Sequence, residues 1–282
     1  MPPAPGSRIV LLTGASSGIG RESALGFARL GDTVVGVASH EPALRELAEQ
    51  QPGIEVEVCD LMVAEERAAL VARVLERHGR IDVLVNNAGV GAVGLLHELS
   101  ARDVERVYAT NVVAYADLTR LVLPSMLAQR SGAVVVLSSA AAWISGPPST
   151  VYASSKFAVD GLVEGLRRET HGTGVLVHSV NPGPVATDYL LRTDERSRQP
   201  GDPDVPLAPG VPASWVADAV LAVAAASHAS TRSVPRVVGL TRLAQLPPVG
   251  FVVDVVLGRY ATSAVAGTRR MVDRRVRALL GR

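Results

Sequence analysis

The sequence predicts an α/β protein, with a doubly wound parallel sheet of about seven strands in a single domain. Short valine-rich apolar runs recur along the chain, and a longer stretch with helical spacing separates each run from the next. The runs are nearly continuous in apolar residues, as expected of strands whose two faces are both covered by helices. The chain has 282 residues, which is enough for one large hydrophobic core.

The expected strands and helices alternate in order along the chain. The strand-like runs are 8–14 (RIVLLTG), 32–39 (DTVVGVAS), 54–60 (IEVEVCD), 81–87 (IDVLVNN), 132–139 (GAVVVLSS) and 174–180 (GVLVHSV), and one more short strand is expected at 235–239. Helical spacing is clear in 63–79 (VAEERAALVARVLERHG) and 214–227 (SWVADAVLAVAAAS). In such a fold ligands bind at the carboxyl ends of the strands, so the site is expected there.

Composition limits the kinds of partner and compartment. The net charge of +1 favours small molecules over nucleic acid. The most apolar run, 249–258, is short and broken by Asp254, so no transmembrane span is expected. The N-terminus lacks a signal-peptide pattern, which predicts a cytoplasmic location. The one cysteine, Cys59, has no Cys or His at metal-ligand spacing, so it is expected to be buried and inert, and no metal is expected.

A glycine-rich segment, TGASSGIG at 13–20, follows the first expected strand and opens a helix. Missing Cβ atoms let a backbone turn tightly and approach a pyrophosphate, and the amino end of the helix stabilises the negative charge. The placement of this segment predicts a dinucleotide-binding, Rossmann-type fold.

The TGxxxGxG spacing and the motifs that follow it resemble the short-chain dehydrogenase/reductase family. The resemblance extends over about 8–239, and the matching features are Asp60 after the third run, NNAG at 86–89, Asn111 in a helix, Ser139 after the fifth run, YxxxK formed by Tyr152 and Lys156, and NPGPVAT at 181–187. The resemblance implies that Asn111, Ser139, Tyr152 and Lys156 are catalytic. Ser138 competes with Ser139 for the serine role, but the spacing to Tyr152 favours Ser139.

The resemblance also implies a nicotinamide cofactor. Its predicted binding residues are Gly14, Ser16, Ser17, Gly18, Ile19, Gly20, Ser39, His40, Asp60, Leu61, Asn87, Ala88, Gly89, Tyr152, Lys156, Pro182, Gly183, Val185 and Thr187. Ala38 stands where the NAD enzymes of the family place an aspartate, so NADP(H) is favoured and NAD(H) stays possible. Ser39, with His40 or Arg45, is a candidate donor to a 2′-phosphate, although His40 also fits an ordinary solvated turn.

Lys156 is the only lysine in a chain whose other basic side chains are all arginine. Tyr152 and Lys156 are one helical turn apart, so their side chains lie on one face of a helix expected to begin near Tyr152. An adjacent ammonium favours the phenolate and lowers the pKa of a tyrosine, which suits Tyr152 to proton exchange. A compact ammonium fits beneath a phenol where a planar guanidinium does not. By resemblance, Ser139 bonds the substrate oxygen, Lys156 also bonds the nicotinamide ribose, and Asn111 helps to hold a water-linked proton relay.

The segments that flank the predicted site are mostly apolar, which favours a bulky ketone, aldehyde or alcohol over a charged metabolite as substrate. The candidate pocket residues are Val93, Leu95, Trp143, Tyr189 and Leu190, although Trp143 also fits the core. The loop at about 184–212 is too long for an ordinary connection and is expected to close over the site.

The domain prediction is a catalytic unit over 1–240, which includes that loop, and a helical C-terminal extension over 241–282. Arginines alternate with apolar residues near the end of the extension. It is expected to pack on its own domain, to form an oligomer interface or to contact an anionic membrane surface. The resemblance implies a homodimer or homotetramer.

The function that these features predict is an NAD(P)-dependent oxidoreductase that interconverts a carbonyl and an alcohol, with reduction by NADPH favoured. Two alternatives stay open: a nucleotide-binding sensor or scaffold without turnover, and a lyase or isomerase on the same fold. The full set of Asn111, Ser139, Tyr152 and Lys156 disfavours the sensor, and the TGxxxGxG spacing and single-domain length disfavour the lyase.

Overall fold

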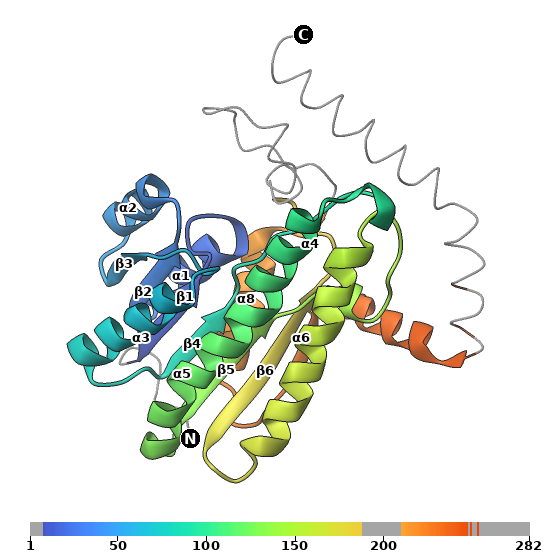
Figure 1. Ribbon diagram of the computed structural model, residues 1–282. Helices are drawn as coiled ribbons and strands as arrows, with labels where there is room; N and C mark the ends of the chain where they lie inside the picture. The colour runs from blue at the N-terminus through green and yellow to red at the C-terminus, as the bar shows by residue number, and fades with distance from the viewer. Residues whose placement is uncertain (1–7, 188–209, 248, 250–252, 254–282) are drawn as a thin grey trace.

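A computed structural model describes residues 8–187 and 210–247, together with positions 249 and 253 (Figure 1). The strands are β1 (Ile9–Thr13), β2 (Thr33–Ala38), β3 (Ile54–Val58), β4 (Val83–Asn86), β5 (Gly132–Leu137), β6 (Val175–Pro182) and β7 (Thr231–Val234). The α-helices are α1 (Gly18–Arg29), α2 (Glu41–Gln50), α3 (Ala64–His78), α4 (Ala101–Tyr108), α5 (Ala114–Gln129), α6 (Thr150–Glu169) and α8 (Ala213–Ala224). Shorter helical segments are η1 (Leu96–Glu98), the π-helical η2 (Ala109–Val113), η3 (Ala140–Ala142) and the 3₁₀ segment η4 (Arg236–Gln245).

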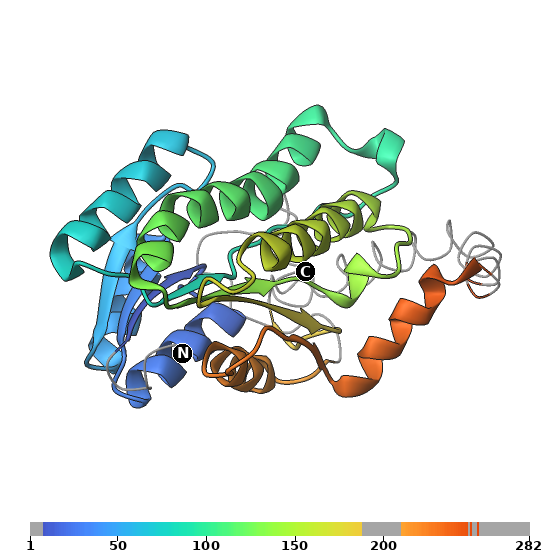
Figure 2. The same ribbon diagram turned by 90° about the horizontal axis from the view of Figure 1, so that it is seen from below.

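The seven strands form one parallel sheet in the order β3-β2-β1-β4-β5-β6-β7. Helices cover both faces: α3, α5 and α6 lie on one side, and α1 and α8 lie on the other (Figures 1 and 2). This confirms the predicted doubly wound Rossmann-type sheet.

Two separate cores explain why the strands are apolar on both faces. Successive strand residues point to opposite sides, so Val10 and Leu12 pack towards α1 and α8, whereas Leu11 packs towards α3 and α5. All three side chains are fully buried. The near-continuous apolar runs in the sequence are therefore the consequence of burial on both faces.

The strand order reverses between β1 and β4, which are neighbours in the sheet although two other strands lie between them in the sequence. Loops that leave the carboxyl ends of these two strands diverge to opposite faces and leave a crevice between them. The glycine-rich segment follows β1, and Asn87–Gly89 follows β4. The reversal thus brings Thr13 of the first predicted motif and Asn87 of the second, 74 positions apart, to one place.

The last strand differs from its prediction. The expected strand at 235–239 is wrong, because β7 spans Thr231–Val234 and the chain continues as η4 from Arg236. Thr231–Val234 carries two polar residues and one charged residue and pairs only with β6, as suits the edge of a sheet. The apolar residues that suggested a strand, Val237 and Val238, belong to η4 instead.

The predicted substrate loop is described only at its two ends. A bridge pairs Val185 with Val211, where the Ala186 N–H donates to the Val211 carbonyl and the Val211 N–H donates to the Pro184 carbonyl. The stems of the loop therefore meet beside the end of β6. Tyr189 and Leu190 lie outside the described residues, as does most of the extension at 241–282. Among the described helices, none is long and apolar enough to cross a membrane.

Candidate active site

A cavity of about 790 Å³ opens at the carboxyl ends of the strands. Its walls come from the segments that follow β1, β2, β3, β4, β5 and β6, and from α4, η2 and α6. The residues that line it are Gly14, Ser16, Ser17, Gly18, Ile19, Gly20, Ala38, Ser39, Cys59, Asp60, Leu61, Met62, Asn87, Ala88, Gly89, Val90, Arg106, Thr110, Leu137, Ser138, Ser139, Ala140, Ala141, Ile144, Tyr152, Lys156, Pro182, Gly183, Pro184, Val185 and Thr187. Most of the predicted cofactor and catalytic residues thus share one cavity.

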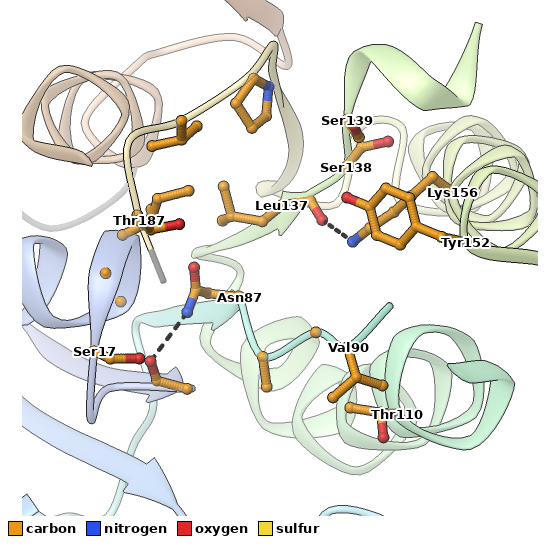
Figure 3. A pocket seen from close by; sticks show the side chains of 18 of the residues that line it. Ser17, Asn87, Val90, Thr110, Leu137, Ser138, Ser139, Tyr152, Lys156 and Thr187 are labelled. Carbon is orange, nitrogen blue, oxygen red and sulfur yellow. Dashed lines mark hydrogen bonds between the residues drawn. The ribbon is translucent and has the colours of Figure 1, made fainter. Parts of the chain in front are cut away.

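The glycine-rich segment, which includes Ser17, forms one end of this cavity together with Thr187 (Figure 3). Gly14 and Gly18 have φ angles of +70° and +53°, which side chains with a Cβ rarely adopt. A Cβ at Gly20 would lie 2.0 Å from the carbonyl oxygen of Gly14, so this turn closes only around a bare backbone. The glycines of this segment are therefore required by the shape of the turn itself, and not only by the binding of a ligand.

Polar bonds fix the glycine-rich segment to the end of β4. The Thr13 hydroxyl accepts the backbone N–H groups of Asn87 and Ala88 at 3.0 and 3.1 Å. The Asn87 side chain donates to the Thr13 carbonyl at 2.8 Å and to the Gly14 carbonyl at 3.3 Å. These bonds join the two sides of the crevice where the strand order reverses.

The residues present fit a dinucleotide at this end of the cavity. No acidic residue lies in the first turn of α1. The amino end of α1 is thus suited to a diphosphate, whose charge the helix dipole and the backbone N–H groups stabilise. Asp60, Leu61 and Met62 line the cavity beside it, and the Asp60 carboxylate accepts the Met62 N–H at 2.9 Å.

Residues after β2 shape the part of the cavity where a ribose 2′ substituent is expected. Ala38 ends the strand and Ser39 is exposed, and both line the cavity. His40 does not line it, because its Nδ1 accepts the Ala43 N–H at 3.4 Å as the N-cap of α2. Arg45 is bonded to Glu41 at 3.0 Å. The structure thus places His40 in the ordinary turn role, and Ser39 is the one predicted 2′ donor at the cavity wall.

Tyr152 and Lys156 lie at the opposite end of the cavity from the glycine-rich segment (Figure 3). Both come from the first two turns of α6, which begins at Thr150, two residues before the predicted start. Tyr152 is partly exposed, whereas Lys156 is 4% exposed. The Lys156 ammonium donates to the Leu137 carbonyl at 2.7 Å and lies 5.7 Å from the centroid of the Tyr152 ring. Burial lowers the pKa of Lys156 to about 7, although Asp160 opposes this shift.

Ser139 lines the cavity two residues after β5 ends, in extended backbone. Its Oγ accepts the Ala141 N–H at 3.1 Å as the N-cap of η3, which leaves the hydroxyl proton available to donate to a ligand. Ser138 also lines the cavity, and its buried Oγ has no hydrogen-bond partner within the described residues. Both serines thus reach the cavity. The orientation of the Ser139 hydroxyl is fixed by its bond from the Ala141 N–H, whereas the Ser138 hydroxyl has no such bond among the described residues.

Asn111 is fully buried in the π-helical η2 and does not line the cavity. Its side-chain amide accepts the Val90 N–H and donates to the Val90 carbonyl, both at 2.9 Å. It also donates to the Ser155 hydroxyl at 3.0 Å. The amide therefore ties the segment after β4 to α6, and it holds the cavity wall instead of facing a ligand.

The predicted substrate residues are not brought together. Val93 and Leu95 do not line the cavity. Trp143 is 3% exposed, its indole N–H donates to Asp160 at 2.7 Å, and the Arg242 guanidinium lies 4.7 Å from its ring centroid. Trp143 therefore packs η3, α6 and η4 together, which corrects its prediction as a pocket residue. The reason is its indole N–H, which finds a partly buried acceptor in Asp160.

Several cavity residues were missed from the sequence. Val90, Ile144, Thr110 and Arg106 line it beside the catalytic groups. Thr110 directly precedes Asn111, and Val90 directly follows the NNAG motif, so closeness to those motifs was an available signal. Nothing in the sequence around Ile144 or Arg106 distinguishes them from neighbouring loop and helix residues.

The described His, Cys, Asp and Glu side chains bear on metal and thiol chemistry. Within the described part of the chain, no group of three or more His, Cys, Asp or Glu side chains is placed to hold a metal ion. Cys59 is 1% exposed, and burial raises the pKa of its thiol to about 11. The thiol is thus uncharged at neutral pH, and its predicted burial is confirmed.

The sheet order, the glycine-rich crevice and the Ser139, Tyr152 and Lys156 side chains at one cavity together define a dinucleotide-dependent oxidoreductase. Residues 8–198 match the family model described as short chain dehydrogenase. The chain belongs to the short-chain dehydrogenase/reductase family and is an NAD(P)-dependent dehydrogenase or reductase.

Known proteins agree with this assignment. A 3-oxoacyl-[acyl-carrier-protein] reductase of Thermotoga maritima is 34% identical over 204 residues, which cover 71% of this chain and 83% of that protein. A metagenomic short-chain oxidoreductase solved in complex with NADP is 30% identical, with a TM-score of 0.67 over 79% of this chain and 95% of that one. A short-chain dehydrogenase/reductase of Burkholderia phymatum solved with NAD is 29% identical, with a TM-score of 0.74 over 85% and 93% of the two chains.

Proposed function

We propose that this protein is an NADPH-dependent reductase that converts a ketone or aldehyde with a largely apolar body into an alcohol. The single observation that carries the proposal is that Ser139, Tyr152 and Lys156 line the same cavity as the glycine-rich segment. The Thermotoga maritima relative, by its name a reductase of a 3-oxoacyl group, supports reduction as the direction.

Tyr152 exchanges the proton with the substrate oxygen. In reduction a hydride adds to the carbonyl carbon, the C=O π electrons move to oxygen, and the Tyr152 hydroxyl gives that oxygen its proton. When bound, the nicotinamide ring supplies this hydride. The Lys156 ammonium, which lies beside the Tyr152 ring, stabilises the tyrosinate that remains after this proton transfer. When the substrate is an alcohol, the hydride and the proton move in the opposite directions.

Ser139 stabilises the negative charge that develops on the substrate oxygen. Its Oγ already accepts a bond from the Ala141 N–H, so the hydroxyl proton is directed to another acceptor. A donor that is fixed before the reaction starts requires no reorganisation when charge develops. Asn111, in contrast, acts as a positioning residue, because its amide is bonded to Val90 and Ser155 behind the cavity wall.

The residues at the end of β2 favour NADPH over NADH. Ala38 presents no carboxylate that would repel a 2′-phosphate, and the exposed Ser39 hydroxyl is able to donate to it. The nearest acid in sequence, Glu41, is bonded to Arg45, which offsets its charge. Solved relatives with NADP and with NAD show that the family uses both cofactors.

The residues that line the cavity around Tyr152 limit the class of substrate. Val90 and Ile144 are apolar, and they favour a hydrophobic body next to the carbonyl. Arg106 and Thr110 add polar groups that the sequence had not indicated. We therefore expect a substrate that combines an apolar body with a polar or anionic end.

The test is the loss of NADPH absorbance when purified protein meets a panel of ketones and aldehydes, half of them with a carboxylate. Turnover with NADPH, at least tenfold faster than with NADH and absent in Tyr152→Phe, supports the proposal. The control is NADPH binding by Tyr152→Phe, measured by fluorescence, which should be retained. Binding without turnover across the panel would favour the sensor, and retained cofactor with no net redox change would favour the lyase or isomerase.

A further inference from the structure

Lys156 carries its charge in an enclosed place. It is 4% exposed, and its ammonium donates to one described acceptor, the Leu137 carbonyl. None of the ion pairs between described residues includes it. Taking an ammonium out of water costs free energy that its surroundings must offset. One carbonyl bond is a small part of what water provides.

Two aromatic rings offset part of the free energy that the Lys156 ammonium loses on leaving water. The Lys156 Nζ lies 5.4 Å from the centroid of the Tyr115 ring and 5.7 Å from that of the Tyr152 ring. Both distances are within the range in which the negative face of an aromatic ring attracts a cation, and the attraction is strongest where water is excluded. The rings come from different helices, since Tyr115 lies in the first turn of α5 and Tyr152 in α6.

The part of Tyr115 that acts on Lys156 is its ring. Tyr115 is fully buried, and its hydroxyl has no hydrogen-bond partner within the described residues. Burial raises the pKa of this hydroxyl well above its usual value, so it stays neutral and forms no ion pair with Lys156. The other titratable groups that act on Lys156 are Tyr152 and Asp160, and both belong to α6.

We propose that Tyr115 is a positioning residue whose ring holds the Lys156 ammonium in its place at the cavity and stabilises its charged form. Tyr152 cannot fill this role alone, because its hydroxyl gains and loses a proton during the proposed reaction. Tyr115 keeps one charge state throughout. The importance of Tyr115 for catalysis rests on the proposed function, whereas the effect of its ring on the pKa of Lys156 does not.

The single lysine makes a direct test possible. Protein labelled with ¹³C at lysine Cε gives one resonance, and its chemical shift followed over pH reports the pKa of Lys156 without substrate or cofactor. Tyr115→Leu removes the ring, and we expect the titration midpoint to fall by about one pH unit. Tyr115→Phe keeps the ring and removes only the unpartnered hydroxyl, so its midpoint should stay within about 0.3 pH unit of the unaltered protein.

A third variant guards against a change in packing. Trifluorophenylalanine at position 115 has nearly the shape of phenylalanine but a less negative ring face, so the midpoint should fall although the fold is kept, which circular dichroism checks. Equal midpoints in the Leu, Phe and fluorinated variants would overturn the proposal, as would a Phe variant that shifts as far as Leu. If the enzyme proves inactive with all carbonyl compounds, these titrations still decide the role of Tyr115.

Discussion

Tyr152 and Lys156 occupy one face of α6, but their surroundings differ. Tyr152 reaches the cavity and is partly exposed, whereas Lys156 is enclosed by the Leu137 carbonyl and the two tyrosine rings. Because the space around Lys156 is bounded on these sides, its size and shape matter as much as its charge. This agrees with the choice of the one lysine in the chain for this position.

At this scale we predict that Lys156→Arg lowers kcat/KM at least about 100-fold. A planar guanidinium is wider than an ammonium and cannot keep both the 2.7 Å bond to Leu137 and the contacts with the rings. Steady-state kinetics with the best ketone of the panel measures the effect. The matched control is Arg168→Lys on the same helix, whose side chain is 74% exposed, and its activity should be unchanged. An active Lys156→Arg enzyme would contradict our account of this residue.

At the scale of elements, helix starts and strand ends bring the chemistry together. The turn before α1 is shaped by glycine, since Gly20 leaves no room for a Cβ next to the Gly14 carbonyl. In α6, by comparison, Gly161 and Gly165 have nothing within 4 Å of where a Cβ would lie. Glycines of the same chain thus have different roles, and only the tertiary contacts separate them.

We predict opposite effects of Gly→Ala in these two helices. Gly20→Ala forces the glycine-rich turn apart, so the free energy of unfolding should fall and NADPH affinity should drop at least about tenfold. Gly161→Ala meets open space inside a helix, so it should raise the free energy of unfolding by about 0.5–1 kcal/mol with no change in NADPH binding. Denaturant unfolding and fluorescence titration measure both quantities. Equal effects of the two substitutions would show that the contacts of Gly20 do not matter.

At the scale of the whole molecule, stability depends on a sheet that is buried on both faces, and buried polar groups lie within it. His178 in β6 is fully buried, and its Nδ1 lies 3.2 Å from the Ser230 hydroxyl. Burial lowers the pKa of His178 to about 4, and the positive charges of Arg167 and His228 act in the same direction. The folded protein therefore keeps this imidazole neutral at pH values where an unfolded chain would protonate it.

The free energy of unfolding should depend on pH in a way that reflects the lowered pKa of His178. Between pH 6.5 and about 4 the unfolded state binds more protons at His178 than the folded state, so stability is present above pH 6.5 and falls as the pH decreases. We expect a loss on the order of 2 kcal/mol between pH 7 and 5. Glu55 and Asp117, whose pKa values are lowered by arginine contacts despite burial, contribute only at lower pH. His178→Gln should flatten this part of the profile, and an unchanged slope would contradict the prediction.

The sequence determined the features that depend on local order along the chain. Valine-rich runs, helical spacing and the glycine-rich turn predicted the layers and the crevice, because burial on both faces and a bare backbone leave direct traces in residue type. YxxxK predicted two side chains on one helix face, because residues four positions apart lie one above the other on a helix.

Only the tertiary structure decided which side chains face the cavity. Trp143 turned to Asp160, His40 became the cap of α2, and Asn111 bonded Val90 and Ser155 behind the wall. Tyr115 came to lie against Lys156, 41 positions away, through the packing of α5 on α6. These outcomes depend on partners distant in the chain, whose distances and burial no local pattern encodes. The sequence therefore indicated the chemistry, and the packing of the helices on the sheet assigned it to particular atoms.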